Sequence, residues 1–315
     1  MIAARDIFTP EELIALKQKS DLRGAWLIFH AWAVIFAAMA MFVWWPNPVT
    51  FLLAVAIIGA RQLGLAVLAH DAAHGLMANN LKLNDFEGTW LTDNILLADM
   101  YAYRKYHVMH HRFTQQKNDP DLGLSAPFPI TRESLRRKII RDLSGQTAYK
   151  QRIGLIRRAF GKPGEPWSLR INKGWHRLHG AIITNAILFA ILAMTGHWWL
   201  YPLLWVVPFF TFLPMVERFR SIAEHSMVTD NDDPFRNTRT TYANWFARAF
   251  VAPYYVNYHL EHHLVMAVPS YNQPKMHKML LAKGYGPRME TKPGYIAILS
   301  LASSKQPTPA MRAAA

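Results

Sequence analysis

The sequence predicts an all-α integral membrane protein with four transmembrane helices arranged in two hairpins. Three observations predict this fold. The chain of 315 residues is 51% hydrophobic, and its apolar residues gather into four long blocks that come in two pairs. Basic residues give the chain a net charge of +14 and lie mostly outside these blocks. Histidines cluster in three short windows, which also lie outside the apolar blocks or at the end of one.

The four apolar blocks are long enough to cross a bilayer. They run over residues 25–45, 49–69, 181–200 and 201–216. A transmembrane helix needs about 20 apolar residues, or fewer when it is tilted or shielded. Buried helices of a soluble all-α protein usually keep a polar stripe, so we favour membrane spans over that alternative. The two predicted turns carry aromatic residues, as an interfacial belt would: Trp44, Trp45, Trp198, Trp199 and Tyr201.

The charge distribution predicts the orientation of the spans. The segment between the hairpins, residues 104–177, carries seventeen Lys and Arg against five Asp and Glu, whereas the turns carry no Lys or Arg. The positive-inside rule therefore places this segment and both termini in the cytoplasm, at the inner membrane if the protein is bacterial. Because topology accounts for the charge, we do not expect nucleic acid as a partner.

Three domain regions are predicted. Residues 1–24 form a short interfacial helix, in which Thr9 caps the N-terminus and Pro10 takes the first position. Residues 25–299 form one membrane domain, and residues 300–315 form a disordered tail because they are mostly small and polar. The chain has no cysteine, which excludes disulfides and thiolate-bound iron–sulfur clusters.

Eight of the fourteen histidines fall in three boxes of five residues each. The spacing is i, i+4 in the first box and i, i+3, i+4 in the other two, which places the imidazoles on one side of a helix. Imidazole binds iron, copper, nickel and zinc without adding a charge. Eight ligands are too many for one ion, so the sequence predicts a dimetal site in a cytoplasmic helical cap. The boxes contain His70, His74, His107, His110, His111, His259, His262 and His263.

Further residues are candidates for the same site. His225 lies between the fourth span and the third box and is a candidate ninth ligand. Ligating imidazoles usually need an acceptor on the other ring nitrogen, and nearby carboxylates could serve. Asn257 is a candidate for holding a metal-bound water. His277 is expected at the surface or an interface. The candidate carboxylates are Asp71, Asp119, Asp121, Glu224 and Glu261.

The three boxes around two membrane hairpins resemble the integral-membrane fatty acid desaturase and hydroxylase superfamily. The resemblance covers about residues 70–266, and His225 matches an additional histidine that members carry before the third box. It implies two iron ions held by the eight box histidines and His225. It also implies a reaction that uses O2 and two supplied electrons to remove hydrogen from an unactivated C–H bond of an apolar substrate in the bilayer.

The resemblance also bears on partners and substrate. The chain contains no His-Pro-Gly-Gly haem motif, so electrons are expected from a separate ferredoxin, rubredoxin or cytochrome b5. The first box has three residues between its histidines. This spacing favours the acyl-lipid, sphingolipid-type and carotenoid-modifying members over the acyl-CoA desaturases of animals.

Four functions are compatible with these features to different degrees. Desaturation of a lipid acyl chain is favoured, and hydroxylation or ketolation of a lipid or carotenoid is the first alternative. A membrane metal transporter or storage protein would need ligands along the spans, which offer only His30, Arg61 and His197. A zinc-dependent hydrolase would need only three protein ligands at its metal.

Overall fold

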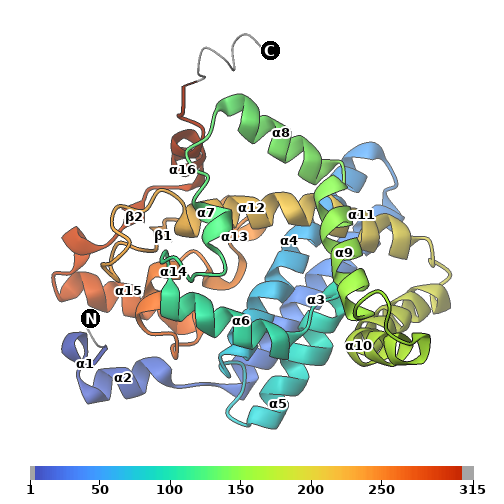
Figure 1. The fold of residues 1–315 in the computed structure, drawn as a ribbon, viewed down its shortest axis with the longest axis horizontal. Helices are drawn as coiled ribbons and strands as arrows, with labels where there is room; N and C mark the ends of the chain where they lie inside the picture. Colours follow the sequence, from blue (N-terminus) through green and yellow to red (C-terminus); the bar gives the residue numbers. More distant parts are fainter. Residues whose placement is uncertain (1–3, 307–315) are drawn as a thin grey trace. The chain divides into compact units, whose positions relative to one another are not determined.

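A computed structural model describes residues 4–306 of the chain (Figure 1). It is mostly helical, and its only sheet among these residues pairs the two-residue strands β1 (Thr240–Thr241) and β2 (Thr291–Lys292) in parallel. By its internal contacts the chain divides into two compact units. Unit 1 comprises Met1–Gln18, Lys105–Ile140 and Glu217–Ala315, and unit 2 comprises Lys19–Arg104 and Arg141–Val216.

This division differs from the single domain that we predicted for residues 25–299. The segments of each unit alternate along the chain, so a search for a change in composition along the sequence does not reveal the boundary. Three helices, α6 (Met100–Phe113), α8 (Arg132–Leu143) and α12 (Phe212–His225), run from one unit into the other.

Unit 2 contains most of the candidate spans. Four segments are long and apolar enough to cross a membrane, as the sequence predicts: α3 (Asp21–Trp44), α4 (Pro48–Ala73), α10 (Trp167–Met194) and Tyr201–His225. The last comprises η3 (Tyr201–Val206), α11 (Val207–Phe210) and α12. The turn between α3 and α4 is short because the side chain of Asn47 accepts the backbone N–H groups of Val49 and Thr50 and so caps α4.

The predicted third and fourth spans need correction at their ends. Helix α10 begins at Trp167, fourteen residues before the predicted start at 181, and ends at Met194 instead of 200. Gly196 adopts a φ of 77°, which is the left-handed conformation that commonly ends a helix. The apolar stretch up to residue 200 therefore forms the turn, and the fourth segment extends to His225 instead of 216.

The rest of unit 2 covers the ends of these helices. Three short helical segments follow α4, namely α5 (Leu81–Phe86), the π-helix η1 (Glu87–Asp93) and the 3-10 helix η2 (Asn94–Leu96). Helix α9 (Gln146–Ala159) precedes α10. Inside the unit, the buried side-chain amide of Gln62 on α4 donates to the carbonyl of Trp205 on η3 at 2.9 Å. A polar residue in one candidate span is thus satisfied by a backbone carbonyl of another candidate span.

Unit 1 begins with α1 (Ala4–Ile7) and α2 (Pro10–Lys17). Thr9 and Glu12 form a capping box, with the Thr9 backbone N–H donating to Glu12 at 2.9 Å and the Glu12 N–H donating to Thr9 at 3.3 Å. Ile7, Phe8 and Leu16 bury their side chains in an apolar core. The residues that complete this core come mostly from the C-terminal third of the chain: Phe235, Leu260, Val265, Val268, Met276, Leu280 and Met289.

The remaining elements of unit 1 are short. They are α7 (Leu122–Ser125), α8 (Arg132–Leu143, which ends in unit 2), α13 (Trp245–Phe250), η4 (Pro253–Tyr255), α14 (His259–Leu264), η5 (Ser270–Asn272), α15 (Gln273–Ala282), η6 (Gly286–Arg288) and α16 (Tyr295–Ala302). Figure 1 shows α2 alongside α15 within this unit. Helix α16 covers the first three residues of the predicted tail, and Ser304 forms a bridge with Thr131. The remainder, 307–315, lies outside the described residues.

Candidate metal centre

Helices α6 and α14 carry the second and third histidine boxes, and both belong to unit 1 at these positions. The spacing within each box places its histidines on consecutive turns, as the sequence predicts. The two boxes do not act as separate clusters. Each contributes histidines to two groups, because the residues at i and i+4 belong to one group and the residue at i+3 belongs to the other.

The first group, which we call the four-histidine group, contains His110, His225, His259 and His263. One ring nitrogen from each lies within 4.8 Å of the others. The Nε2 atom of His259 is 2.8 Å from that of His225 and 3.1 Å from that of His263. Metal–nitrogen bonds of about 2.0–2.1 Å in a tetrahedral site place nitrogens roughly 3.3 Å apart, so these four nitrogens are close enough to share one ion.

The second group, which we call the three-histidine group, contains His107, His111 and His262. The Nε2 atom of His111 is 2.9 Å from the Nε2 atoms of both His107 and His262. The two groups are neighbours, since the rings of His111 and His263 stack with centroids 4.2 Å apart. Seven histidines of unit 1 therefore form two adjacent clusters of converging ring nitrogens.

The first box lies in unit 2, at the end of α4. The rings of His70 and His74 are 5.0 Å apart, and Asp71 lies 3.4 Å from Nδ1 of His70. Arg104 covers this helix end. Its guanidinium donates to the carbonyls of Ala73 at 2.8 Å and Ala72 at 3.1 Å in the last turn of α4.

A carboxylate supports the four-histidine group through His110. The Nδ1 atom of His110 lies 2.8 Å from Oδ1 of Asp119, and both side chains are 1% exposed. Burial alone would raise the pKa of Asp119, but hydrogen bonds from His110 and from the backbone amides of Asp121 and Gln115 outweigh it, so the pKa lies below its ordinary value. With this acceptor at Nδ1, Nε2 is the ring atom of His110 that could coordinate a metal.

The other predicted carboxylates have different positions. Asp121 is 3.7 Å from His110 and accepts a hydrogen bond from Tyr106 at 2.5 Å, so Asp119 is the closer partner. Glu224 lies 3.7 Å from Nδ1 of His259 and is held by Arg220 at 2.7 Å.

Glu261 points away from the box histidines of its own helix. It accepts a hydrogen bond from Nδ1 of His277 at 2.6 Å and another from the hydroxyl of Thr240. His277 is buried, so the prediction that it lies at the surface is wrong. Asn257 is also buried, and its amide donates to the carbonyl of Thr241 at 3.0 Å. The Oδ1 atom of Asn257 accepts no hydrogen bond within the described part of the chain.

Burial determines the charge of His263. Loss of solvent around the ring, followed by the neighbouring histidines, lowers its pKa well below the ordinary value. The ring is therefore neutral at physiological pH. A neutral imidazole has the free lone pair that a metal ligand needs.

Sequence reasoning missed the residues that hold the segment after His225. The guanidinium of the fully buried Arg239 donates to the carbonyl of Ala223 in the last turn of α12 and to those of Ser226 and Met227 after it, at 2.9–3.1 Å. It also pairs with Glu290 at 3.1 Å. The side-chain amide of Gln115 donates to the carbonyl of His225 at 2.8 Å. Only Gln115 had a sequence signal, because it follows the second box by four residues.

Comparison with known proteins supports this picture. A sequence model of the fatty acid desaturase family matches residues 44–292. The chain belongs to the fatty acid desaturase family. This confirms the resemblance based on the histidine boxes, and the family implies an oxidoreductase in a membrane context with a lipid substrate.

Three curated relatives differ in their named substrates. The chain is 30% identical over 302 residues to a dihydrorhizobitoxine desaturase of Bradyrhizobium elkanii, covering 89% of this chain and 80% of the relative. It is 22% identical to a beta-carotene ketolase of Paracoccus sp. (strain PC1), covering 86% and 95%, and 22% identical to an sn-1 oleoyl-lipid 12-desaturase of Arthrospira platensis, covering 73% and 66%. Family membership alone thus leaves the reaction outcome and the substrate open.

Proposed function

We propose that this protein is a di-iron enzyme that uses O2 to desaturate a lipid acyl chain. The observation that carries the proposal is the pair of adjacent histidine groups built on α6 and α14. The proposed ligands are the seven histidines of these groups together with His70 and His74 at the end of α4. When bound, two irons would supply the redox chemistry for breaking an unactivated C–H bond, which no side chain of the chain could supply.

The donor set fits iron. All proposed ligands are imidazole nitrogens, and no thiolate or directly coordinating carboxylate is required. Asp119 supports the tautomer of His110 that presents Nε2 to the metal. Glu224 lies closest to Nδ1 of His259 and can act similarly. We assign Asn257, with its unused Oδ1, to a metal-bound water.

Burial of the four-histidine group contributes to the reaction in another way. His110, His225 and His259 are all buried. Exclusion of bulk water strengthens electrostatic interactions and limits side reactions of activated oxygen. The chain therefore supplies a dry, neutral and nitrogen-rich site for the metals.

We infer the membrane arrangement from the distribution of Lys and Arg, and a separate electron donor from the lack of a His-Pro-Gly-Gly motif in the sequence. The basic segment between the hairpins favours cytoplasmic termini and a cytoplasmic histidine site, at the inner membrane if the protein is bacterial. Electrons would come from a separate ferredoxin, rubredoxin or cytochrome b5. A hydroxylase or ketolase acting on a lipid or carotenoid is a second candidate, which the similarity to a beta-carotene ketolase favours.

Lipid profiling tests the reaction. Cells that express the chain are compared by mass spectrometry with cells that express His262→Ala and with a matched control, His197→Ala, which changes a histidine outside both groups. Loss of about two hydrogens from acyl chains in the wild type and in the control, but not in His262→Ala, is expected. A gain of one oxygen would show the hydroxylase reaction instead, and a gain of one oxygen with a loss of two hydrogens would show the ketolase reaction.

Metal analysis of the purified protein tests the site independently of turnover. We expect about two iron atoms per chain in the wild type and about one in His225→Ala, because this variant leaves the three-histidine group intact. Wild-type protein that binds no iron after expression in iron-replete cells and anaerobic reconstitution would overturn the di-iron assignment.

A further inference from the structure

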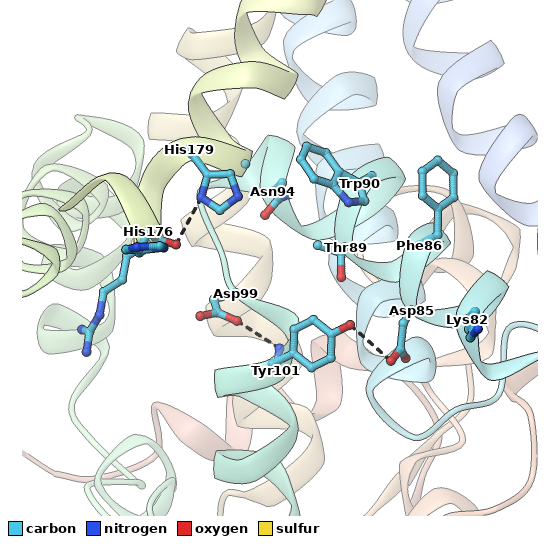
Figure 2. A pocket seen from close by; sticks show the side chains of 12 residues that line it. Lys82, Asp85, Phe86, Thr89, Trp90, Asn94, Asp99, Tyr101, His176 and His179 are labelled. Carbon is cyan, nitrogen blue, oxygen red and sulfur yellow. Dashed lines mark hydrogen bonds between the residues drawn. The ribbon is translucent and has the colours of Figure 1, made fainter. Parts of the chain in front are cut away.

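Unit 2 contains two adjoining cavities of opposite character. One has a volume of about 600 Å³ and is lined largely by charged and polar side chains (Figure 2). The other has a volume of about 430 Å³ and is almost entirely apolar. Phe86 and Trp90 line both, so the two cavities meet at these rings. Each volume lies in the range of roughly 300–1,000 Å³ that is typical of ligand sites.

The acidic residues of the polar cavity are already engaged by the protein. Asp85 is paired with Arg104 at 2.6 Å and accepts a hydrogen bond from the hydroxyl of Tyr101 at 3.3 Å. Asp99 accepts the backbone N–H groups of Tyr101 and Ala102 at the start of α6, at 3.0 and 3.1 Å. Figure 2 shows Asp85, Asp99 and Tyr101 together, on the side of the cavity away from Phe86 and Trp90. Arg104 neutralises Asp85, whereas Asp99 keeps its charge and is held at the start of α6, so Lys82 and Arg177 leave the lining with a net positive charge.

The basic residues of the polar cavity have no such partners. Lys82 and Arg177 are both exposed, and neither forms an ion pair with a carboxylate among the described residues. Arg177 makes only a long contact, 3.4 Å, with the carbonyl of Arg158. His179 uses Nδ1 toward the carbonyls of Trp175 and His176, which leaves its Nε2 for a ligand. The cavity therefore offers positive charge to an anion.

The apolar cavity has walls that are fixed by specific hydrogen bonds. The indole N–H of Trp32 on α3 donates to the carbonyl of Leu91 on η1 at 3.0 Å. The amide of Asn185 on α10 donates to the carbonyl of Ile95 on η2 at 3.3 Å. These two hydrogen bonds fix the candidate spans α3 and α10 to the short helices η1 and η2, and the groove lies between them. Its lining comprises Trp32, Phe36, Phe86, Trp90, Leu91, Ile95, Ile183, Thr184, Ile187, Leu188 and Ile191.

Helix α10 shows how the two cavities relate to a bilayer. Its residues His176, Arg177 and His179 line the polar cavity, and the next turns line the apolar one through Ile183, Ile187 and Ile191. The last three are spaced at i, i+4 and i+8, so they form a single face. Along this helix the side chains change from basic to apolar. Such a change is expected at the boundary between the headgroup layer and the hydrocarbon layer of a bilayer.

We propose that these two cavities form one binding site for an anionic lipid. The phosphate of the headgroup lies in the polar cavity with Lys82 and Arg177, and one acyl chain lies in the apolar groove below Phe86 and Trp90. Basic pockets at the cytoplasmic end of transmembrane helices are suited to anionic headgroups, and the neighbouring groove adds the requirement for a hydrocarbon chain. The site does not involve the histidine groups.

Binding of defined lipids to the purified, delipidated protein tests the site. Native mass spectrometry would measure retention of palmitoyl-oleoyl phosphatidylglycerol and of the phosphatidylcholine with the same chains. We expect phosphatidylglycerol to bind more tightly and Lys82→Gln/Arg177→Gln to weaken it by about 20- to 30-fold, with little change for phosphatidylcholine. The matched control, Arg141→Gln/Lys150→Gln, removes the same charge from exposed positions of unit 2 outside both cavities and should bind as the wild type does.

Two further measurements separate a lipid site from a simple anion site. Ile187→Trp fills the groove and should weaken the binding of phosphatidylglycerol, although the basic residues stay in place. Millimolar inorganic phosphate should compete poorly, because it lacks the acyl chain. Equal loss of binding in the control variant, or full displacement by inorganic phosphate, would overturn the proposal. If the double variant fails to fold, the salt dependence of the wild type tests the proposal instead. Its preference for phosphatidylglycerol over phosphatidylcholine must fall as the salt concentration is raised, and a preference that does not fall would overturn the proposal.

Discussion

Replacing Arg239 with methionine is expected to destabilise the protein by about 3 kcal/mol. Arg239 is fully buried, pairs with Glu290 at 3.1 Å and donates to three backbone carbonyls on either side of His225. Methionine has a similar length, so little volume is lost and the effect reports on charge and hydrogen bonding. Removal of one partner of a buried ion pair typically costs about 3–5 kcal/mol, because the other charge stays buried.

The lower end of this range applies because Glu290 keeps two other partners. The hydroxyl of Thr229 donates to it at 3.0 Å, and the ammonium of Lys292, which is 34% exposed, lies 3.3 Å away. In the Arg239→Met variant, these two contacts partly compensate the buried negative charge of Glu290.

Thermal unfolding in detergent, followed by intrinsic fluorescence, measures the effect. A loss of about 3 kcal/mol should lower Tm by roughly 6 °C or more. Arg239→Lys keeps the charge but has fewer donors and should fall between the wild type and Arg239→Met. The double variant Arg239→Met/Glu290→Gln removes the isolated carboxylate and should recover part of the loss. A Tm for Arg239→Met within 1 °C of the wild type would refute this account of the buried pair.

Three other predictions concern single side chains. Asp119→Asn should weaken metal binding by the four-histidine group about 10- to 100-fold in a chelator competition, with the three-histidine group unaffected, because Asn cannot replace the charged acceptor. Burial raises the pKa of Asp93 to about 7, so the folded state holds more protons than the unfolded state between about pH 4 and 7, and stability falls as pH rises through that window. Asp93→Asn should accordingly raise Tm at pH 8 and leave it nearly unchanged at pH 4. A Cβ at Gly24 would lie 2.1 Å from the backbone carbonyl oxygen of Met77, so Gly24→Ala should lower Tm by several degrees, whereas Gly123→Ala, whose Cβ meets nothing within 4 Å, should not.

Much of the fold could be predicted because membrane spans and helix caps leave local signals. Apolar length predicted four spans, and the Thr-x-x-Glu pattern predicted the cap of α2. The start of α10 could not be predicted in this way. Its first turns, from Trp167, are polar, and hydropathy detects only the part of a helix that would enter the hydrocarbon layer.

The site was partly predictable for a similar reason. Spacing on a helix predicted that His107, His110 and His111 share one side of α6, but the division of each box between two groups depends on neighbours that are distant in sequence. Sequence proximity misled us at Glu261. Adjacent residues on a helix do not face each other, so Glu261 points away from His262 and toward His277.

The partners of Arg239 had no sequence signal at all. Glu290 is 51 residues further along the chain, and the carbonyls that Arg239 holds carry no sequence information. Asp119 was among the candidate carboxylates, but its advantage over Asp121 comes from a turn in which its own N–H donates to the carbonyl of Gln116. Turn geometry of this kind decides which of two nearby carboxylates reaches a histidine.

The interleaved segments of unit 1 have a consequence for biosynthesis. Its three parts are separated in sequence by the two parts of unit 2, and the apolar side chains of α2 pack against residues from the C-terminal third. The carbonyl of Leu16, for example, accepts a hydrogen bond from Asn272 at 2.9 Å. Helices α1 and α2 can therefore complete their packing only after residues more than 200 positions further along the chain have been synthesised. The four-histidine group likewise needs α14, so it can form only after all four candidate spans have been synthesised. Under the proposed function, a metal could bind that group only after α14 has been synthesised, and a chain that stalls before α14 would have His110 and His225 without the other two histidines of the group.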